Sequence, residues 1–169
     1  MKKVFFIIPI ILMLFTACSE ESAEIAELSA EYGIPIEVLK SNEFKDFMSA
    51  IAEATKADAK LQDEFFKITS SNSEKMEMLK EVVDESQKKQ LSMKEVDQQY
   101  KTKVGVSPFD VEMHNVVKTK REVFFKKFPE YEKNLEKFEP IEKYFKKEVI
   151  DYDNFMAERE ANIFNNEND

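Results

Sequence analysis

The sequence predicts an all-α protein, a small helical bundle of about four main helices preceded by short N-terminal helices. The 169-residue chain has only two glycines and five prolines, whereas Glu, Lys, Ala and Met are frequent, and this composition favours helix over strand. Apolar residues also recur every three or four positions over long stretches. A chain of this length can bury one modest core. We therefore expect a single all-α domain over residues 23–164, followed by a disordered polar tail at 165–169.

Two short helices are expected first. Ser22 is a suitable N-cap for a helix over residues 23–32, and Gly33 suits its C-terminal end. Pro35 then opens a second short helix over residues 36–40.

The clearest periodicity predicts a long helix over residues 44–68. Its positions follow steps of three and four, namely Phe44, Phe47, Ile51, Ala54, Asp58, Leu61, Phe65 and Ile68. Asp58 interrupts this apolar series, and burial of an unpaired carboxylate is costly. Two interpretations stay open: the helix rotates to expose Asp58, or a lysine from another helix reaches it.

A further helix begins at Glu74, and its buried side carries Met76, Leu79, Val82 and Val83. The apolar pattern weakens around residues 86–89, and Ser92 to Glu95 has the form of a capping box. The helix therefore either ends near Gln90 or continues to about residue 100.

The next start signal is Ser107-Pro108-Phe109-Asp110, with serine as the cap and proline in the first turn. The helix that it opens is expected to place Met113, Val117, Arg121, Phe124 and Phe128 along one side. Pro129 ends or kinks it. A short helix over residues 130–139 follows, and Pro140 is expected to begin the last helix, which extends to Ile163.

Charge is unevenly distributed along the chain. The chain has a net charge of −9, but residues 101–150 contain 12 basic and 9 acidic side chains, a local net charge of +3. Either basic helices pack beside acidic ones, or the basic residues meet lipid head groups or an anionic envelope polymer. The basic residues concerned are Lys118, Lys120, Arg121, Lys126 and Lys127. The overall negative charge argues against nucleic acid as a partner.

Several kinds of catalytic or metal site are excluded by composition. Two isolated glycines cannot form a glycine-rich phosphate loop, and one cysteine with one histidine cannot build a zinc site. We expect no cofactor, no metal and no catalytic residues. His114 is the only histidine of the chain, and Asp110 lies one helical turn before it, so these two residues form a candidate carboxylate–imidazole pair.

Aromatic residues are concentrated in the last third of the chain. Of 17 Phe and Tyr residues after position 18, ten lie between Phe124 and Phe164. They form either a broad buried face or a groove that contacts a partner or ligand. The candidate contact residues are Lys118, Arg121, Phe124, Phe125 and Phe128. A cavity lined by Phe124, Phe128, Phe145 and Tyr152 would instead suit a carrier of a small apolar ligand.

The N-terminus reads as a secretory signal peptide. Lys2 and Lys3 precede an uncharged stretch from Val4 to Ala17, which is too short for a membrane-spanning helix. The sequence Leu14-Phe15-Thr16-Ala17-Cys18 resembles the lipobox of bacterial lipoproteins, although Phe15 stands where leucine is commoner. The resemblance implies cleavage after Ala17, which removes residues 1–17, and lipid attachment at Cys18 through acyl chains such as palmitate.

These features together predict a lipid-anchored protein of the cell envelope. Residues 18–22 would form an acidic tether, and by resemblance to the lipoprotein sorting rule Ser19 favours the outer membrane. We expect the domain to act by binding, as an accessory or scaffold subunit or as an inhibitor of an extracytoplasmic protein. The alternatives are the apolar-ligand carrier and an envelope enzyme that uses His114 with carboxylates.

Overall fold

The computed structural model describes residues 22–165, and within this range every regular element is helical. The predicted all-α bundle is therefore confirmed. The predicted signal peptide over residues 1–17, the cleavage residue Ala17, the lipid-attachment residue Cys18, most of the 18–22 tether and residues 166–169 lie outside the described residues. Among the helices that are described, none has the length and apolar character required to span a membrane.

The N-terminal elements follow the sequence closely. Residues 22–32 are helical and end at Gly33, whose φ of +71° is a conformation that glycine adopts without strain. Pro35 precedes α2 (Ile36–Lys40). Ser41 then caps α3 (Asn42–Ser70), because its hydroxyl accepts a hydrogen bond from the backbone N–H of Phe44 at 3.2 Å. The long helix predicted over 44–68 is present and slightly longer.

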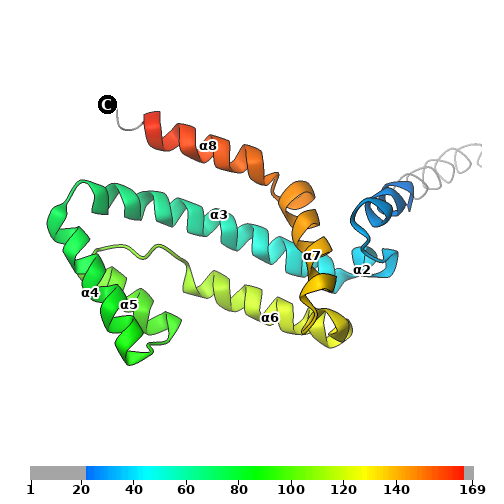
Figure 1. The fold of residues 1–169 in the computed structure, drawn as a ribbon, viewed down its shortest axis with the longest axis horizontal. Helices are drawn as coiled ribbons and strands as arrows, with labels where there is room; N and C mark the ends of the chain where they lie inside the picture. Colours follow the sequence, from blue (N-terminus) through cyan, green and yellow to red (C-terminus); the bar gives the residue numbers. More distant parts are fainter. Residues whose placement is uncertain (1–21, 166–169) are drawn as a thin grey trace, which may run out of the picture.

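The next two helices, α4 (Ser73–Lys89) and α5 (Met93–Lys103), form a hairpin at one end of the molecule (Figure 1). The helix predicted from Glu74 does end near Gln90, which adopts a left-handed conformation with φ 51°. Ser92 and Glu95 form the predicted capping box at the start of α5. Met76 is exposed, contrary to its expected place on the buried side, whereas Val82 is fully buried.

Helix α6 (Val111–Lys127) runs beside α3, and its first residue differs from the prediction. The N-cap is Asp110 and not Ser107: the Asp110 carboxylate accepts the backbone N–H groups of Glu112 and Met113. Ser107 is buried before the helix, and its hydroxyl has no hydrogen-bond partner within the described residues. The start is shifted because Asp58 of α3 accepts the backbone N–H of Asp110 at 2.9 Å and fixes it there.

The chain after α6 also differs from the prediction. It forms η1 (Pro129–Tyr131), α7 (Leu135–Tyr144), the π-helical turn η2 (Phe145–Val149) and α8 (Tyr152–Asn165). The expected helix over 130–139 and the expected start at Pro140 are wrong, since Pro140 lies inside α7. Asn134 caps α7 by accepting the backbone N–H of Lys137. Pro140 has no N–H, so the helix lacks the hydrogen bond that this position would make to the carbonyl of Glu136. The break comes instead at Asp151, which has φ 44°.

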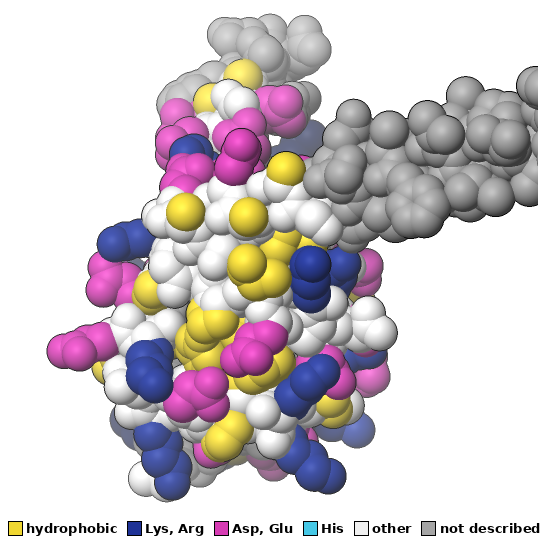
Figure 2. All heavy atoms as spheres, turned by 90° about the vertical axis from the view of Figure 1, so that its right-hand side faces the viewer, with side chains coloured by type: hydrophobic (Ala, Val, Ile, Leu, Met, Phe, Trp, Pro, Cys, Tyr) yellow, Lys and Arg dark blue, Asp and Glu magenta, His cyan; other side chains and the backbone are white. Residues whose placement is uncertain are grey.

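The main core lies at the end of the molecule away from the α4–α5 hairpin. There α7 crosses the ends of α3 and α6, and α8 returns along α3 (Figure 1). Viewed from this end, hydrophobic side chains reach the surface between charged ones (Figure 2). The buried core residues are Ile25, Ile34, Val38, Leu39, Phe44, Phe47, Met48, Phe124, Phe128, Tyr131 and Ile141.

Candidate functional site

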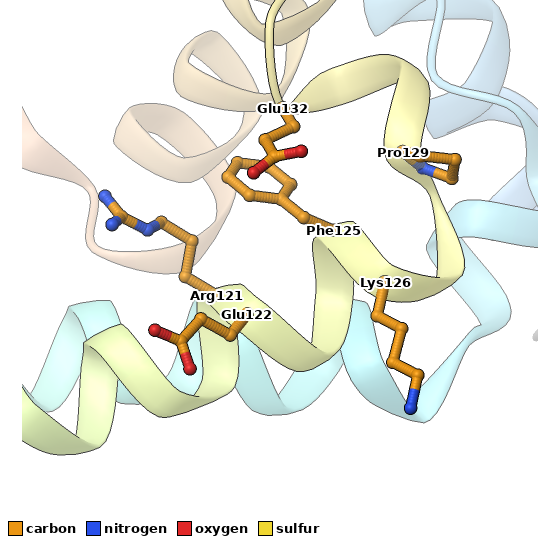
Figure 3. A pocket seen from close by; sticks show the side chains of 6 residues that line it. All are labelled: Arg121, Glu122, Phe125, Lys126, Pro129 and Glu132. Atoms are coloured by element: carbon orange, nitrogen blue, oxygen red, sulfur yellow. The ribbon is translucent and has the colours of Figure 1, made fainter.

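An open groove lies where α6 turns into η1. It is lined by Arg121, Glu122, Phe125, Lys126, Pro129 and Glu132 and has a volume of about 650 Å³; we call it the α6 groove. Arg121 and Phe125 point to the same side of the helix, whereas Lys126 points away from them (Figure 3). Pro129 begins the turn that places Glu132 opposite Phe125. The hollow therefore arises from the local sequence, because α6 ends before Phe128-Pro129 and the chain turns there.

Phe125 provides the apolar surface of the groove, and two aromatic rings of the protein interior hold it in position. It is half-buried, and its ring lies 6.1 Å from that of Phe138 on α7 and 6.4 Å from that of Phe47 on α3, centroid to centroid. Both contacts are close to edge-on, a favoured arrangement of aromatic rings. The groove therefore presents a ring that cannot swing freely, which lowers the entropy lost when a partner binds.

The basic residues of α6 divide into two sets. Lys120 and Lys127 face α3 and form ion pairs with Asp46 and Glu43, each at 2.6 Å. The hydrogen bond from Lys127 is the largest of the effects that lower the pKa of Glu43. For these two lysines, the interpretation that basic helices pack beside acidic ones is correct.

Lys118, Arg121 and Lys126 form the second set. All three are exposed, and none of them makes an ion pair with another residue in the described range 22–165. They are the cations of α6 that remain available to a partner.

The five candidate contact residues therefore do not form one surface. Arg121 and Phe125 lie in the α6 groove, and Lys118 is exposed one turn earlier on the same helix. Phe124 is completely buried and Phe128 is 8% exposed. Their ring centroids lie 5.4 Å apart, and Phe124 also packs against Phe44, Phe47 and Tyr131. Phe124 and Phe128 are core residues and offer no contact surface.

Two of the residues expected to line a cavity for an apolar ligand belong to this packed cluster. Phe124 and Phe128 are enclosed by neighbouring rings, while Tyr152 is exposed and lines a separate, open hollow of about 230 Å³ between α3 and α8. Of the four residues expected to surround one cavity, Phe124 and Phe128 thus belong to the main core and Phe145 packs against it, whereas Tyr152 lies apart from them.

Asp58 and His114 form a pair that the sequence did not indicate. The Asp58 Oδ2 and His114 Nε2 atoms are 2.7 Å apart, and Asp58 Oδ1 accepts the backbone N–H of Asp110. His114 therefore pairs with Asp58 of α3, and not with Asp110 as hypothesised. Neither interpretation of Asp58 was correct: its side chain is only 17% exposed, and a histidine, not a lysine, reaches it.

The surroundings of His114 suit a structural role. Its ring packs edge-on against Phe109, with centroids 6.3 Å apart, and it contacts a single carboxylate. General acid–base catalysis requires a positioned nucleophile or substrate in addition to such a pair. Across the part of the chain that the structure describes, no three His, Cys, Asp or Glu side chains are grouped so that they could hold a metal ion.

Sequence reasoning missed Glu122, Pro129 and Glu132 as groove residues. The signal that could have found them is the Phe128-Pro129 step, since proline after a helix end reverses the chain and brings the next residues back toward the last helical turn. Comparisons with models of protein families, with curated proteins and with solved structures find no match.

Proposed function

We propose that this chain is a lipid-anchored protein of the cell envelope that binds another extracytoplasmic protein, as an accessory or scaffold subunit or as an inhibitor, without catalysis of its own. The N-terminal resemblance to a lipoprotein signal supports the anchoring, and Ser19 favours the outer membrane. Two or three acyl chains on Cys18 hold a protein firmly, since each buried methylene contributes about 0.8 kcal/mol.

The α6 groove is the observation that supports binding. It combines the half-buried ring of Phe125 with the guanidinium of Arg121, which makes no ion pair with the described residues. Aromatic residues, phenylalanine among them, and arginine are enriched in protein interfaces relative to the rest of the surface. The groove therefore suits a protein segment that presents an apolar side chain to Phe125 and polar groups to the charged residues around it, Arg121, Glu122 and Glu132.

The anchoring is tested by replacing the only cysteine of the chain. Cys18→Ala is expected to abolish incorporation of labelled fatty acid and to leave an unprocessed precursor. Ser19→Ala, the matched control, is expected to be labelled with fatty acid and processed like the wild type. Persistent lipid labelling of the Cys18→Ala protein refutes the anchoring.

The binding is tested by affinity capture from envelope extract with the full, tagged chain. A partner recovered in stoichiometric amount by the wild type is expected to bind at least tenfold more weakly to Arg121→Glu and to Phe125→Ala. Lys94→Glu, a charge reversal at an exposed position of α5, is expected to behave like the wild type. Circular dichroism establishes that each variant is folded. Equal capture by all variants means that the α6 groove is not the binding surface.

A further inference from the structure

Helix α6 carries a strip of regularly spaced residues, two of them valines, on the face turned away from α3. Glu112, Val116, Thr119, Val123 and Lys126 follow one another at steps of four, three, four and three residues; we call them the outer strip. Successive helical residues are rotated by about 100°, so these five side chains fall within a sector of about 80°. This spacing is the heptad pattern with which one helix packs against another.

The outer strip is not covered by any of the described elements. Val116 is 43% exposed and Val123 is 48% exposed, and Glu112, Thr119 and Lys126 are also exposed. A shallow hollow of about 360 Å³ lies at its N-terminal half, lined in part by Val116 and Thr119. The opposite face of α6 already packs into the core through Phe124 and Phe128. Core packing in residues 22–165 therefore gives the two exposed valines no role.

The residues of the outer strip are spaced almost symmetrically on either side of Thr119, so the strip can pair with the same strip of a second copy of the chain. Glu112 and Lys126 each lie seven residues from Thr119, about 10.5 Å along the helix axis in opposite directions. Val116 and Val123 lie three and four residues from Thr119. A two-fold axis through Thr119 therefore aligns acid with base at both ends, and valine with valine to within about 1.5 Å.

We infer that the outer strip is the interface of a homodimer in which two α6 helices pack antiparallel. Glu112 of one copy pairs with Lys126 of the partner subunit, and the relation repeats at the other end, as a two-fold interface requires. A parallel pair would instead bring the two Glu112 carboxylates together and the two Lys126 ammonium groups together, which is unfavourable at both ends. Charge complementarity thus selects a second copy and also its orientation.

The small area of the interface indicates how strongly the two copies bind. Helix α6 has 17 residues and is about 25 Å long, so one helix pair buries less than the roughly 1,200 Å² of a small specific interface. The dimer is therefore weak and depends on concentration. It lies on a different face from the ring of Phe125 and does not require the lipid anchor. Lys126 also lines the α6 groove, but Glu112 and Thr119 do not, so variants at these two positions test the dimer separately from the proposed function.

Charge exchange tests the pairing with the full chain in detergent solution, followed by sedimentation equilibrium. Glu112→Lys and Lys126→Glu each place like charges at both ends of the pair, and each is expected to raise the dimer dissociation constant about tenfold. The double variant Glu112→Lys/Lys126→Glu restores opposite charges and is expected to return the constant to within about threefold of the wild type. Absence of a dimer in the wild type, or failure of the double variant to recover while circular dichroism shows it folded, overturns the inference.

A cysteine series tests the orientation separately. In a Cys18→Ser background an introduced cysteine is the only one in the chain. Thr119→Cys is expected to form a disulfide-linked dimer rapidly on mild oxidation, because the two positions meet at the axis. Glu112→Cys is expected not to, because the two copies of this position lie about 21 Å apart in an antiparallel pair and a disulfide requires Cα atoms within about 7 Å. Rapid linkage of Glu112→Cys, or none for Thr119→Cys, contradicts the antiparallel arrangement.

Discussion

At the scale of single residues, Asp58 is the side chain that joins α3 to α6. One carboxylate oxygen accepts from the backbone N–H of Asp110 and the other pairs with His114 Nε2. The backbone bond fixes where α6 begins, and the imidazole bond fixes its rotation one turn later. A polar pair within an otherwise apolar helix contact can set the register of the two helices, and this geometry matches that role.

Replacing Asp58 is therefore expected to be more harmful than replacing its partner. Asp58→Ala removes two hydrogen bonds to a charged acceptor and is expected to lower the free energy of unfolding by about 2–3 kcal/mol, whereas His114→Ala removes one and costs about 1 kcal/mol. Urea unfolding measures both. Asp84→Ala, at an exposed position of α4, is the control and should change stability by less than about 0.5 kcal/mol. Equal losses for Asp58→Ala and Asp84→Ala contradict the joining role.

At the scale of elements, the α4–α5 hairpin depends on one strained residue. Gln90 is the C-cap of α4 with φ 51° and ψ 49°, and its backbone N–H reaches the carbonyl of Ser86. Residues with a Cβ atom pay about 1 kcal/mol for the left-handed region, which glycine occupies freely. The turn is thus formed against a local preference, and packing of the hairpin must supply the difference.

Gln90→Gly is accordingly expected to stabilise the protein by about 0.5–1 kcal/mol through relief of this strain. The matched control is Gln87→Gly, three residues earlier in the exposed interior of α4, which is expected to destabilise by about 1 kcal/mol. Thermal unfolding compares the two variants. Destabilisation by both substitutions argues that the left-handed turn is not maintained in solution.

The helix over residues 22–32 is fastened to η2 by polar contacts. The Tyr32 hydroxyl donates to Glu148 at 2.7 Å, and Lys147 pairs with Glu31 at 2.7 Å. Burial, followed by the hydrogen bond to Glu148, raises the pKa of Tyr32 to about 12. The ordinary tyrosine pKa is about 10. The neutral phenol therefore stabilises the folded state below about pH 10, and this stabilisation is lost as the pH rises to about 12.

Tyr32→Phe tests this contact while it preserves the edge-on packing against Tyr144. The variant is expected to be less stable than the wild type at pH 8. The difference should shrink between about pH 10 and 12, where the phenol ionises in the unfolded wild type but is still neutral in the folded protein. Urea unfolding across this pH range gives the difference directly. A difference that stays constant with pH shows that the hydroxyl is not held by Glu148.

At the scale of the whole molecule, the core is concentrated at one end. Phe44, Phe47 and Phe124 belong to a continuous aromatic cluster shared by α3 and α6. In contrast, Val82 is the one fully buried apolar side chain of α4. Helix α8 is joined to α3 through the Arg159–Asp63 ion pair and a hydrogen bond from Arg159 to Gln62, beside an open hollow.

Hydrogen exchange is expected to follow this division. Amides in the first half of α3 and the second half of α6 should exchange most slowly, and those of α4, α5 and α8 should exchange faster by at least tenfold, because local opening there exposes little apolar surface. Mass spectrometry of peptic fragments measures the pattern. Equal protection of α8 and α3 would mean that the molecule opens as one cooperative unit.

Much of this molecule follows from local sequence. Helix content, the stop at Gly33 and the capping box at Ser92 each depend on a residue and its near neighbours, and all three are present in the structure. Local start signals failed where another nearby residue caps the helix instead. Ser107 and Pro140 have the form of helix starts, but the caps are Asp110 and Asn134.

Only part of the candidate site could be identified from the sequence. Arg121 and Phe125 were identified from charge and aromatic clustering, since those properties are visible along the chain. The sequence did not show whether Phe124 or Phe125 faces outward. Adjacent side chains on a helix point about 100° apart, and only the position of α3 decides which of the two is buried.

The helical class and the periodic faces therefore follow from the amino-acid sequence, because helix propensity and spacing are properties of neighbouring residues. Its N-terminus also predicts the lipid anchor. Only the tertiary structure decided that Asp58 pairs with His114, that Lys120 and Lys127 are used within the fold, and that Val116 and Val123 are left outside it. Those outcomes depend on how α3 and α6 meet, and that meeting is set by many weak contacts between residues far apart in the chain.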